Sequence, residues 1–141
     1  MDSLKFCQQS KDLEIYAYVI IPSHVHLVAG REGGLMSDFI RDFKSHTARK
    51  VIEYISCDGG ESRKEWLLHM FRYYAKCQKQ NKEYQVWQKT SHPIKLFSNE
   101  VIDQKIDYIH MNPVKSGIVE SPEHYCFSSA YDHRQVKVIS A

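Results

Sequence analysis

The longest apolar run of the chain lies at residues 13–21 (LEIYAYVII), and a second run follows at residues 24–29 (HVHLVA). Both runs are rich in β-branched and aromatic residues, and the first is almost continuously apolar, as a buried strand is. Pro22-Ser23 separates the two runs and has the residue types of a turn. The pattern predicts two adjacent strands joined by a tight connection.

Helical spacing of apolar residues dominates the rest of the chain. Helices are predicted at residues 3–10, from Ser37 to a loop at residues 57–62, at roughly 63–80, and from Asn99 to about Met111. The predicted buried positions of the second and third helices are Ile40, Phe43, Thr47, Val51, Tyr54, Trp66, Leu67, Met70 and Tyr74. Ser98 is a plausible N-cap of the last helix, Pro113 follows its end, and residues 84–88 (YQVWQ) read as a further strand. Strands interleaved with helices favour a single α+β domain, a sandwich with helices on one face of an antiparallel sheet.

Composition changes this picture little. The 141 residues are 43% hydrophobic and 26% charged, as in an ordinary soluble protein. The net charge of +2 permits a nucleic-acid partner without requiring one. No apolar run approaches the length of about 18 residues that a membrane-spanning helix needs, and no signal peptide is visible, so we expect a cytoplasmic protein. The four cysteines are scattered without a Cys-x-x-Cys pair, which indicates reduced thiols.

The second apolar run contains a pair of histidines, His24 and His26. In a strand, residues two apart point to the same face, so the two imidazoles would lie side by side. They could share one divalent cation, for which at least one further ligand must come from elsewhere in the chain. The alternative is a pair of hydrogen-bonded histidines at a strand end, and the pattern alone does not decide between the two.

The helix predicted at residues 99–111 has two faces. Its core face comprises Ile102, Ile106 and Ile109, and an adjacent stripe comprises Val101, Lys105, Tyr108 and Asn112. Tyr108 and Asn112 are one turn apart, so their oxygens can point toward one spot. Lys105 precedes Tyr108 by one turn, and a nearby ammonium group favours a phenolate. Taken singly, each of these residues has an ordinary structural explanation as a core tyrosine, a helix-ending asparagine or a solvated charge.

The string DYIHMNPVKSGIVESPEHYCFSS at residues 107–129 resembles the C-terminal signature of the REP-associated tyrosine transposases, which are single-tyrosine HUH transposases related to those of bacterial insertion sequences. VIIPSHVHL at residues 19–27 is similar to the strand that carries the histidine pair in that family. FKSHTARKV at 43–51 and VWQKTSHPIKL at 86–96 also look like family segments, and the four motifs occur in the family order.

The resemblance implies a ferredoxin-like sandwich and a specific chemistry. His24 and His26 would bind Mg²⁺ or Mn²⁺, Tyr108 would be the nucleophile, and Asn112 would be the third metal ligand. The implied reaction is the cleavage and rejoining of single-stranded hairpin DNA during transposition and recombination, through a 5′-phosphotyrosine intermediate. The basic residues that would then contact DNA are Arg41, Lys44, Lys105 and Lys115. Charge alone favours a solvated helix face for such a cluster.

Family members usually carry additional residues before the equivalent of residue 3, including a first strand and most of a first helix. We therefore expect a sheet without its usual first strand, and an exposed strand edge that favours a homodimer. Two other functions are compatible with the residues. A truncated or domesticated DNA-binding module would lack cleavage activity, and a hydrolase of small phosphoesters would use His24 and His26 without Tyr108.

Overall fold

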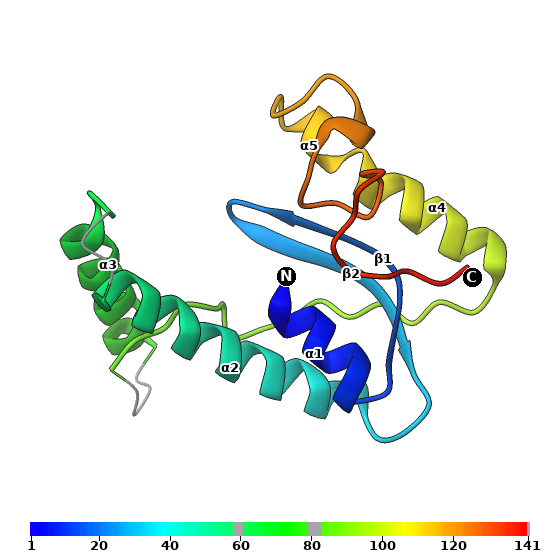
Figure 1. The fold of residues 1–141 in the computed structure, drawn as a ribbon. Helices are drawn as coiled ribbons and strands as arrows, with labels where there is room; N and C mark the ends of the chain where they lie inside the picture. The colour runs from blue at the N-terminus through cyan, green and yellow to red at the C-terminus, as the bar shows by residue number, and fades with distance from the viewer. Residues whose placement is uncertain (58–60, 79–82, 141) are drawn as a thin grey trace. The chain divides into compact units, whose positions relative to one another are not determined.

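The computed structural model describes residues 1–57, 61–78 and 83–140, and it has an α+β fold (Figure 1). The elements are α1 (Asp2–Ser10), β1 (Leu13–Ile21), β2 (His24–Arg31), α2 (Met36–Cys57), α3 (Lys64–Cys77), α4 (Asn99–His110), α5 (Asn112–Lys115) and the 3₁₀ turn η1 (Pro122–His124). The chain divides into two compact units. The first comprises Met1–Met36 and Ile94–Ala141, and the second comprises Ser37–Pro93. The predicted α+β class and the predicted strand pair are confirmed.

The strands β1 and β2 form an antiparallel hairpin that contains one irregularity. Ile15 pairs with Ala29 and Ala17 pairs with Val28, so Tyr16 is an extra residue on β1, as in a β-bulge. Side chains directly opposite each other in a sheet share a face, and an extra residue reverses the alternation along its own strand. Because of the bulge, Ile15 and Ala17, which are two residues apart on β1, are buried on opposite faces of the hairpin.

Helix α4 covers one face of the hairpin. Ile109 is buried in a cluster with Ala17, Val19, Ile21 and Val28, and Ile102 and Ile106 pack against this cluster. The core face that the helical spacing predicted is therefore confirmed. Helix α1 contacts β1 and lies on the other side of the hairpin from α4 (Figure 1), which differs from the single covered face that we expected.

Ile109→Ala tests the contribution of this contact. Ile109 is only 4% exposed, so truncation leaves a cavity between α4 and the hairpin. We expect the free energy of unfolding to fall by about 2–5 kcal/mol in urea titrations. Val101→Ala is a suitable control because Val101 lies on the same helix and is 38% exposed. Equal losses in the two variants would contradict the packing described here.

The two ends of α4 follow local rules. The Ser98 side chain accepts a hydrogen bond from the Val101 amide, as predicted for an N-cap. After Met111 the chain does not leave helical geometry, because Pro113 occupies the first turn of the short helix α5. Gly117 follows α5 with φ +68°, a conformation that favours glycine. Proline thus begins a new helix here as well as ending the previous one.

The edge of β1 opposite β2 carries hydrogen bonds from the C-terminal part of the chain. The Ile20 amide donates to the Phe127 carbonyl, the Ser129 amide donates to the Tyr18 carbonyl, and the Ile139 amide donates to the Ile15 carbonyl. Val19 and Ser128 form an antiparallel bridge between these bonds. This edge of β1 is therefore not the exposed edge that we expected from the resemblance.

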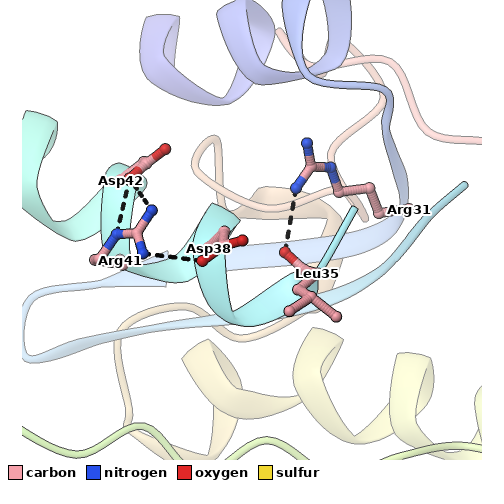
Figure 2. Close-up of polar contacts among 5 residues, drawn as sticks. All are labelled: Arg31, Leu35, Asp38, Arg41 and Asp42. Carbon is pink, nitrogen blue, oxygen red and sulfur yellow. Dashed lines mark hydrogen bonds and ion pairs between the residues drawn. The ribbon is translucent and has the colours of Figure 1, made fainter. Parts of the chain in front are cut away.

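The turn after β2 is held by Arg31. Its guanidinium donates to the carbonyls of Lys11 and Leu35, and Figure 2 shows the second of these contacts. Gly34 has φ +82° and lies beside the same guanidinium, where a Cβ would come within 3.1 Å of a guanidinium nitrogen. Both the backbone conformation and the space favour glycine at this position.

In the second unit, α2 binds part of the segment that follows α3. Trp87 donates from Nε1 to the Thr47 hydroxyl at 2.9 Å, and Lys44 donates from Nζ to the carbonyls of Gln88 and Thr90. These contacts hold residues 84–88 in an irregular conformation, so the strand predicted there is wrong.

Several other predictions can be compared with the structure. Four residues that we expected in the core are exposed, namely Val51, Tyr54, Trp66 and Tyr74. Cys57, Cys77 and Cys126 are free thiols. Part of the loop predicted at 57–62 and the end of the helix predicted at 63–80 lie outside the described residues. Within the described part of the chain, no helix is both long enough and apolar enough to cross a membrane.

Candidate functional site

The histidine pair lies on the hairpin face that α4 covers. His24 pairs with Ile21 and His26 pairs with Val19, whose side chains belong to the cluster under α4. The two imidazole centroids are 4.7 Å apart and the rings are nearly perpendicular. The structure therefore brings the two rings together on one face, as the strand geometry requires.

The free nitrogen atoms of the two rings differ in their surroundings. His26 Nε2 is buried and has no hydrogen-bond partner among the described residues. His24 Nδ1 lies 2.8 Å from the Ser23 hydroxyl, which leaves Nε2 of that ring for another ligand. Burial lowers the pKa of His26, and the neighbouring His24 lowers it further. A neutral imidazole with an unused buried nitrogen is suited to bind a metal ion.

Tyr108 of α4 lies next to this pair. Its ring centroid is 6.1 Å from that of His26, in an edge-to-face arrangement, and the residue is 48% exposed. Lys105 Nζ lies 5.6 Å from the centroid of the Tyr108 ring, and Lys115 Nζ lies 4.9 Å from it. Helix α5 brings Lys115 to Tyr108 because the chain turns into a new helix at Pro113.

The site carries positive charge on a surface that solvent can reach. In the described part of the chain, neither Lys105 nor Lys115 forms an ion pair with a carboxylate, whereas several lysines and arginines elsewhere do. Two ammonium groups beside a phenol and two imidazoles make a site that attracts an anion such as a phosphodiester.

Asn112 lies one turn after Tyr108, as predicted. Its Nδ2 donates to the Tyr108 carbonyl at 3.2 Å, which satisfies a carbonyl group at the end of α4. This hydrogen bond uses the amide nitrogen and leaves the amide oxygen as an acceptor. The amide oxygen of Asn112, which is the atom that would bind a metal, is therefore not used by this hydrogen bond.

The donors present fit a divalent cation that keeps open coordination positions. Two imidazole nitrogens and one amide oxygen leave the remaining positions to water and phosphate oxygens. No group of three His, Cys, Asp or Glu residues that could hold a metal occurs within residues 1–57, 61–78 and 83–140. A metal site at this histidine pair would therefore need a third protein ligand of another kind, for which the sequence offers the amide oxygen of Asn112.

The other two basic residues singled out from the sequence lie in the second unit. Arg41 forms ion pairs with Asp38 and Asp42, as Figure 2 shows. Lys44 is bound to the carbonyls of Gln88 and Thr90. Both side chains thus have partners within their own unit, which distinguishes them from Lys105 and Lys115.

Sequence reasoning missed a further polar contact close to Tyr108. His110 Nε2 lies 2.7 Å from the Ser129 hydroxyl, and Ser129 is buried against β1. Burial lowers the pKa of His110, an effect that Asp107 partly offsets. Both residues belong to the 107–129 string, but their separation of 19 residues gave no periodic signal.

We compared the chain with family models, curated proteins and solved structures, and none of them matches it.

Proposed function

We propose that the chain is a metal-dependent DNA transposase of the REP-associated tyrosine type, which cleaves and rejoins single-stranded hairpin DNA. The observation that carries this proposal is the position of the Tyr108 phenol beside His26, a histidine whose buried Nε2 has no partner among the described residues. The motifs around His24 and Tyr108 support the same assignment.

In the proposed reaction the Tyr108 oxygen attacks a phosphorus atom of the DNA in line with the bond that breaks. The phenol releases its proton, and the departing oxygen takes up a proton to become a 3′-OH. The 5′ phosphate remains esterified to Tyr108. Attack by another 3′-OH on this ester joins two strands and frees Tyr108, so that no external energy source is needed.

The residues around Tyr108 have complementary roles. His24, His26 and Asn112 would hold Mg²⁺ or Mn²⁺, which polarises the phosphodiester and stabilises charge on its oxygens. Lys105 and Lys115 hold positive charge over the Tyr108 ring, where it favours a bound phosphate. The exposure of Tyr108 leaves room for a DNA strand to approach.

We also propose that the hairpin and α4 belong to a ferredoxin-like sandwich and that the protein forms a homodimer. Within the described residues β2 pairs with β1 alone, which leaves its outer edge as a place where a further strand can add. Since the opposite edge of β1 is bonded to the C-terminal part of the chain, β2 is the better candidate for association.

A denaturing gel tests the function directly. The protein is mixed with a labelled hairpin oligonucleotide carrying a single-stranded flank, in the presence of Mn²⁺. We expect a covalent protein–DNA band that is resistant to denaturant and is lost when the metal is chelated. A cleaved product without a covalent band would indicate a hydrolase, which would use His24 and His26 alone.

The second candidate is a DNA-binding module without cleavage activity, and it is favoured as the alternative by the two lysines beside Tyr108, which have no carboxylate partner among the described residues. Lys105 and Lys115 can bind phosphate whether or not a metal is present. This module would retard the hairpin on a native gel in the presence of a chelator and would never give a covalent band.

Lys115→Gln and Lys105→Gln should each weaken hairpin binding. Each variant removes one cation that has no carboxylate partner in the described part of the chain. We expect about a fivefold loss of affinity, corresponding to an exposed charge interaction of about 1 kcal/mol. The slope of log affinity against log salt should become shallower by about 0.7 for each phosphate that the protein no longer neutralises.

Fluorescence anisotropy of a labelled hairpin at several salt concentrations provides the measurement. Arg41→Gln is the matched control, because Arg41 is already paired with Asp38 and Asp42. An unchanged salt slope in both lysine variants would contradict the assignment of these residues to the DNA-binding surface.

A further inference from the structure

Tyr108 and His110 lie on opposite sides of the line along which α4 contacts the hairpin. Successive residues of a helix are about 100° apart, so Tyr108 and His110 flank Ile109 symmetrically. Ile109 is buried against the hairpin, Tyr108 lies beside His26, and His110 reaches Ser129. If α4 rotated about its own axis, one of the two side chains, Tyr108 or His110, would move toward the sheet and the other would move away from it.

Ser129 is fixed to β1 by its own hydrogen bonds. Its amide donates to the Tyr18 carbonyl at 2.9 Å, and its hydroxyl accepts from the Tyr18 amide at 2.9 Å. Tyr18 directly precedes Val19, the residue that pairs with His26. A short hydrogen-bonded path thus runs from α4 through Ser129 to the strand opposite the histidine pair.

Apolar packing alone does not fix the rotation of α4. The hydrophobic contacts of Ile109 are non-directional, so they specify the rotation of the helix less sharply than a hydrogen bond does. A hydrogen bond requires a short distance and a narrow range of angles, so the 2.7 Å contact between His110 and Ser129 is sensitive to rotation.

We infer that His110 and Ser129 are positioning residues, which hold α4 in the rotation that places Tyr108 beside His26. We call this contact the His110 brace. The effect of this contact on DNA cleavage rests on the proposed function. Its effect on the position of the Tyr108 ring does not. Without the brace, α4 remains folded on the hairpin, but the Tyr108 ring leaves its position next to His26.

The test uses Ser129→Ala and His110→Leu, with two matched variants. Ser128→Ala removes the same hydroxyl from the neighbouring buried residue, whose side chain accepts a local hydrogen bond from the Ala130 amide. His110→Gln retains a side-chain nitrogen that can reach Ser129, and should restore the brace. Far-UV circular dichroism establishes that each variant is folded.

The first readout is independent of metal and DNA. In the full chain, nuclear Overhauser effects between the ring protons of His26 and Tyr108 report their proximity. We expect these effects in the wild type, Ser128→Ala and His110→Gln, and their absence in Ser129→Ala and His110→Leu. Effects that persist in Ser129→Ala, or that disappear equally in Ser128→Ala, would overturn the inference.

The second readout is the rate of covalent attachment at saturating hairpin and Mn²⁺. A misplaced nucleophile should slow this step by about tenfold to a hundredfold in Ser129→Ala even when hairpin and Mn²⁺ are saturating. A variant that is only destabilised would show the wild-type rate once the rate is expressed per folded molecule. If the wild type gives no covalent band while the ring proximities follow the expected pattern, the proposed function fails and the brace stands.

Discussion

Tyr108→Phe is expected to abolish covalent attachment of DNA, with a loss of at least about a thousandfold, because it removes the oxygen that forms the ester in the proposed reaction. The substitution should leave the rest of the site in place. Phenylalanine retains the edge-to-face contact with His26 and the ring beneath the two ammonium groups. Tyr108 is 48% exposed, and its hydroxyl has no role in the core, so folding should be unaffected.

The measurement is the covalent band on a denaturing gel, together with hairpin affinity in the same buffer. We expect Tyr108→Phe to bind the hairpin as the wild type does and to give no band. Tyr74→Phe is the control, since Tyr74 is also an exposed helical tyrosine, 50% exposed, in the second unit. An undiminished band in Tyr108→Phe would exclude Tyr108 as the nucleophile, and loss of the band in Tyr74→Phe would place the nucleophile elsewhere.

The parts of the site that sequence reasoning could predict depend on local rules. Alternation in a strand places His24 and His26 on one face, and helical spacing places Tyr108 and Asn112 one turn apart. Ser98 identifies the start of α4 because a serine hydroxyl can accept from a helix N-terminal amide. These features require no knowledge of distant contacts, and the structure agrees with each of them.

The features that were missed depend on contacts between residues far apart in the sequence. Residues 84–88 have strand-like composition, but the Trp87 indole and the carbonyl of Gln88 bond to side chains of α2, 40 and 44 residues away. The bulge at Tyr16 is visible only in the pairing of β1 with β2.

Lys115 was singled out for its charge, but its position beside Tyr108 was not foreseen. That position follows from α5, whose first turn contains a proline that the sequence rules treat as a helix end. The contact of His110 with Ser129 was missed for a related reason, since it depends on the C-terminal residues bonding to the edge of β1. Neither arrangement is encoded in a local pattern of polar and apolar residues.

His26→Leu is expected to eliminate Mn²⁺ binding, with at least about a hundredfold loss of affinity, because one of the three proposed protein ligands disappears. His24→Ala should have a similar effect, and Asn112→Ala a smaller one. Isothermal titration of the protein with MnCl₂ measures the affinity. His69→Ala is the control, since His69 is exposed on α3 in the second unit. Full affinity in His26→Leu would show that the metal binds elsewhere.

The same substitution distinguishes a metal ligand from a structural histidine. A structural histidine contributes hydrogen bonds, and its replacement by leucine lowers stability. His26 Nε2 is buried without a partner in the described part of the chain, so it costs free energy in the metal-free protein. Replacement by an apolar side chain removes that cost, and we therefore expect the metal-free His26→Leu variant to be at least as stable as the wild type.

Mn²⁺ should reverse the order of stability of the wild type and His26→Leu. At a free Mn²⁺ concentration a hundred times the dissociation constant, the wild type gains about 2.7 kcal/mol of unfolding free energy, because only the folded state binds. His26→Leu should gain nothing under the same conditions. Urea unfolding with a chelator and with Mn²⁺ gives both values. If His26→Leu is destabilised without metal and the wild type is not stabilised by Mn²⁺, then His26 serves the fold and not a metal.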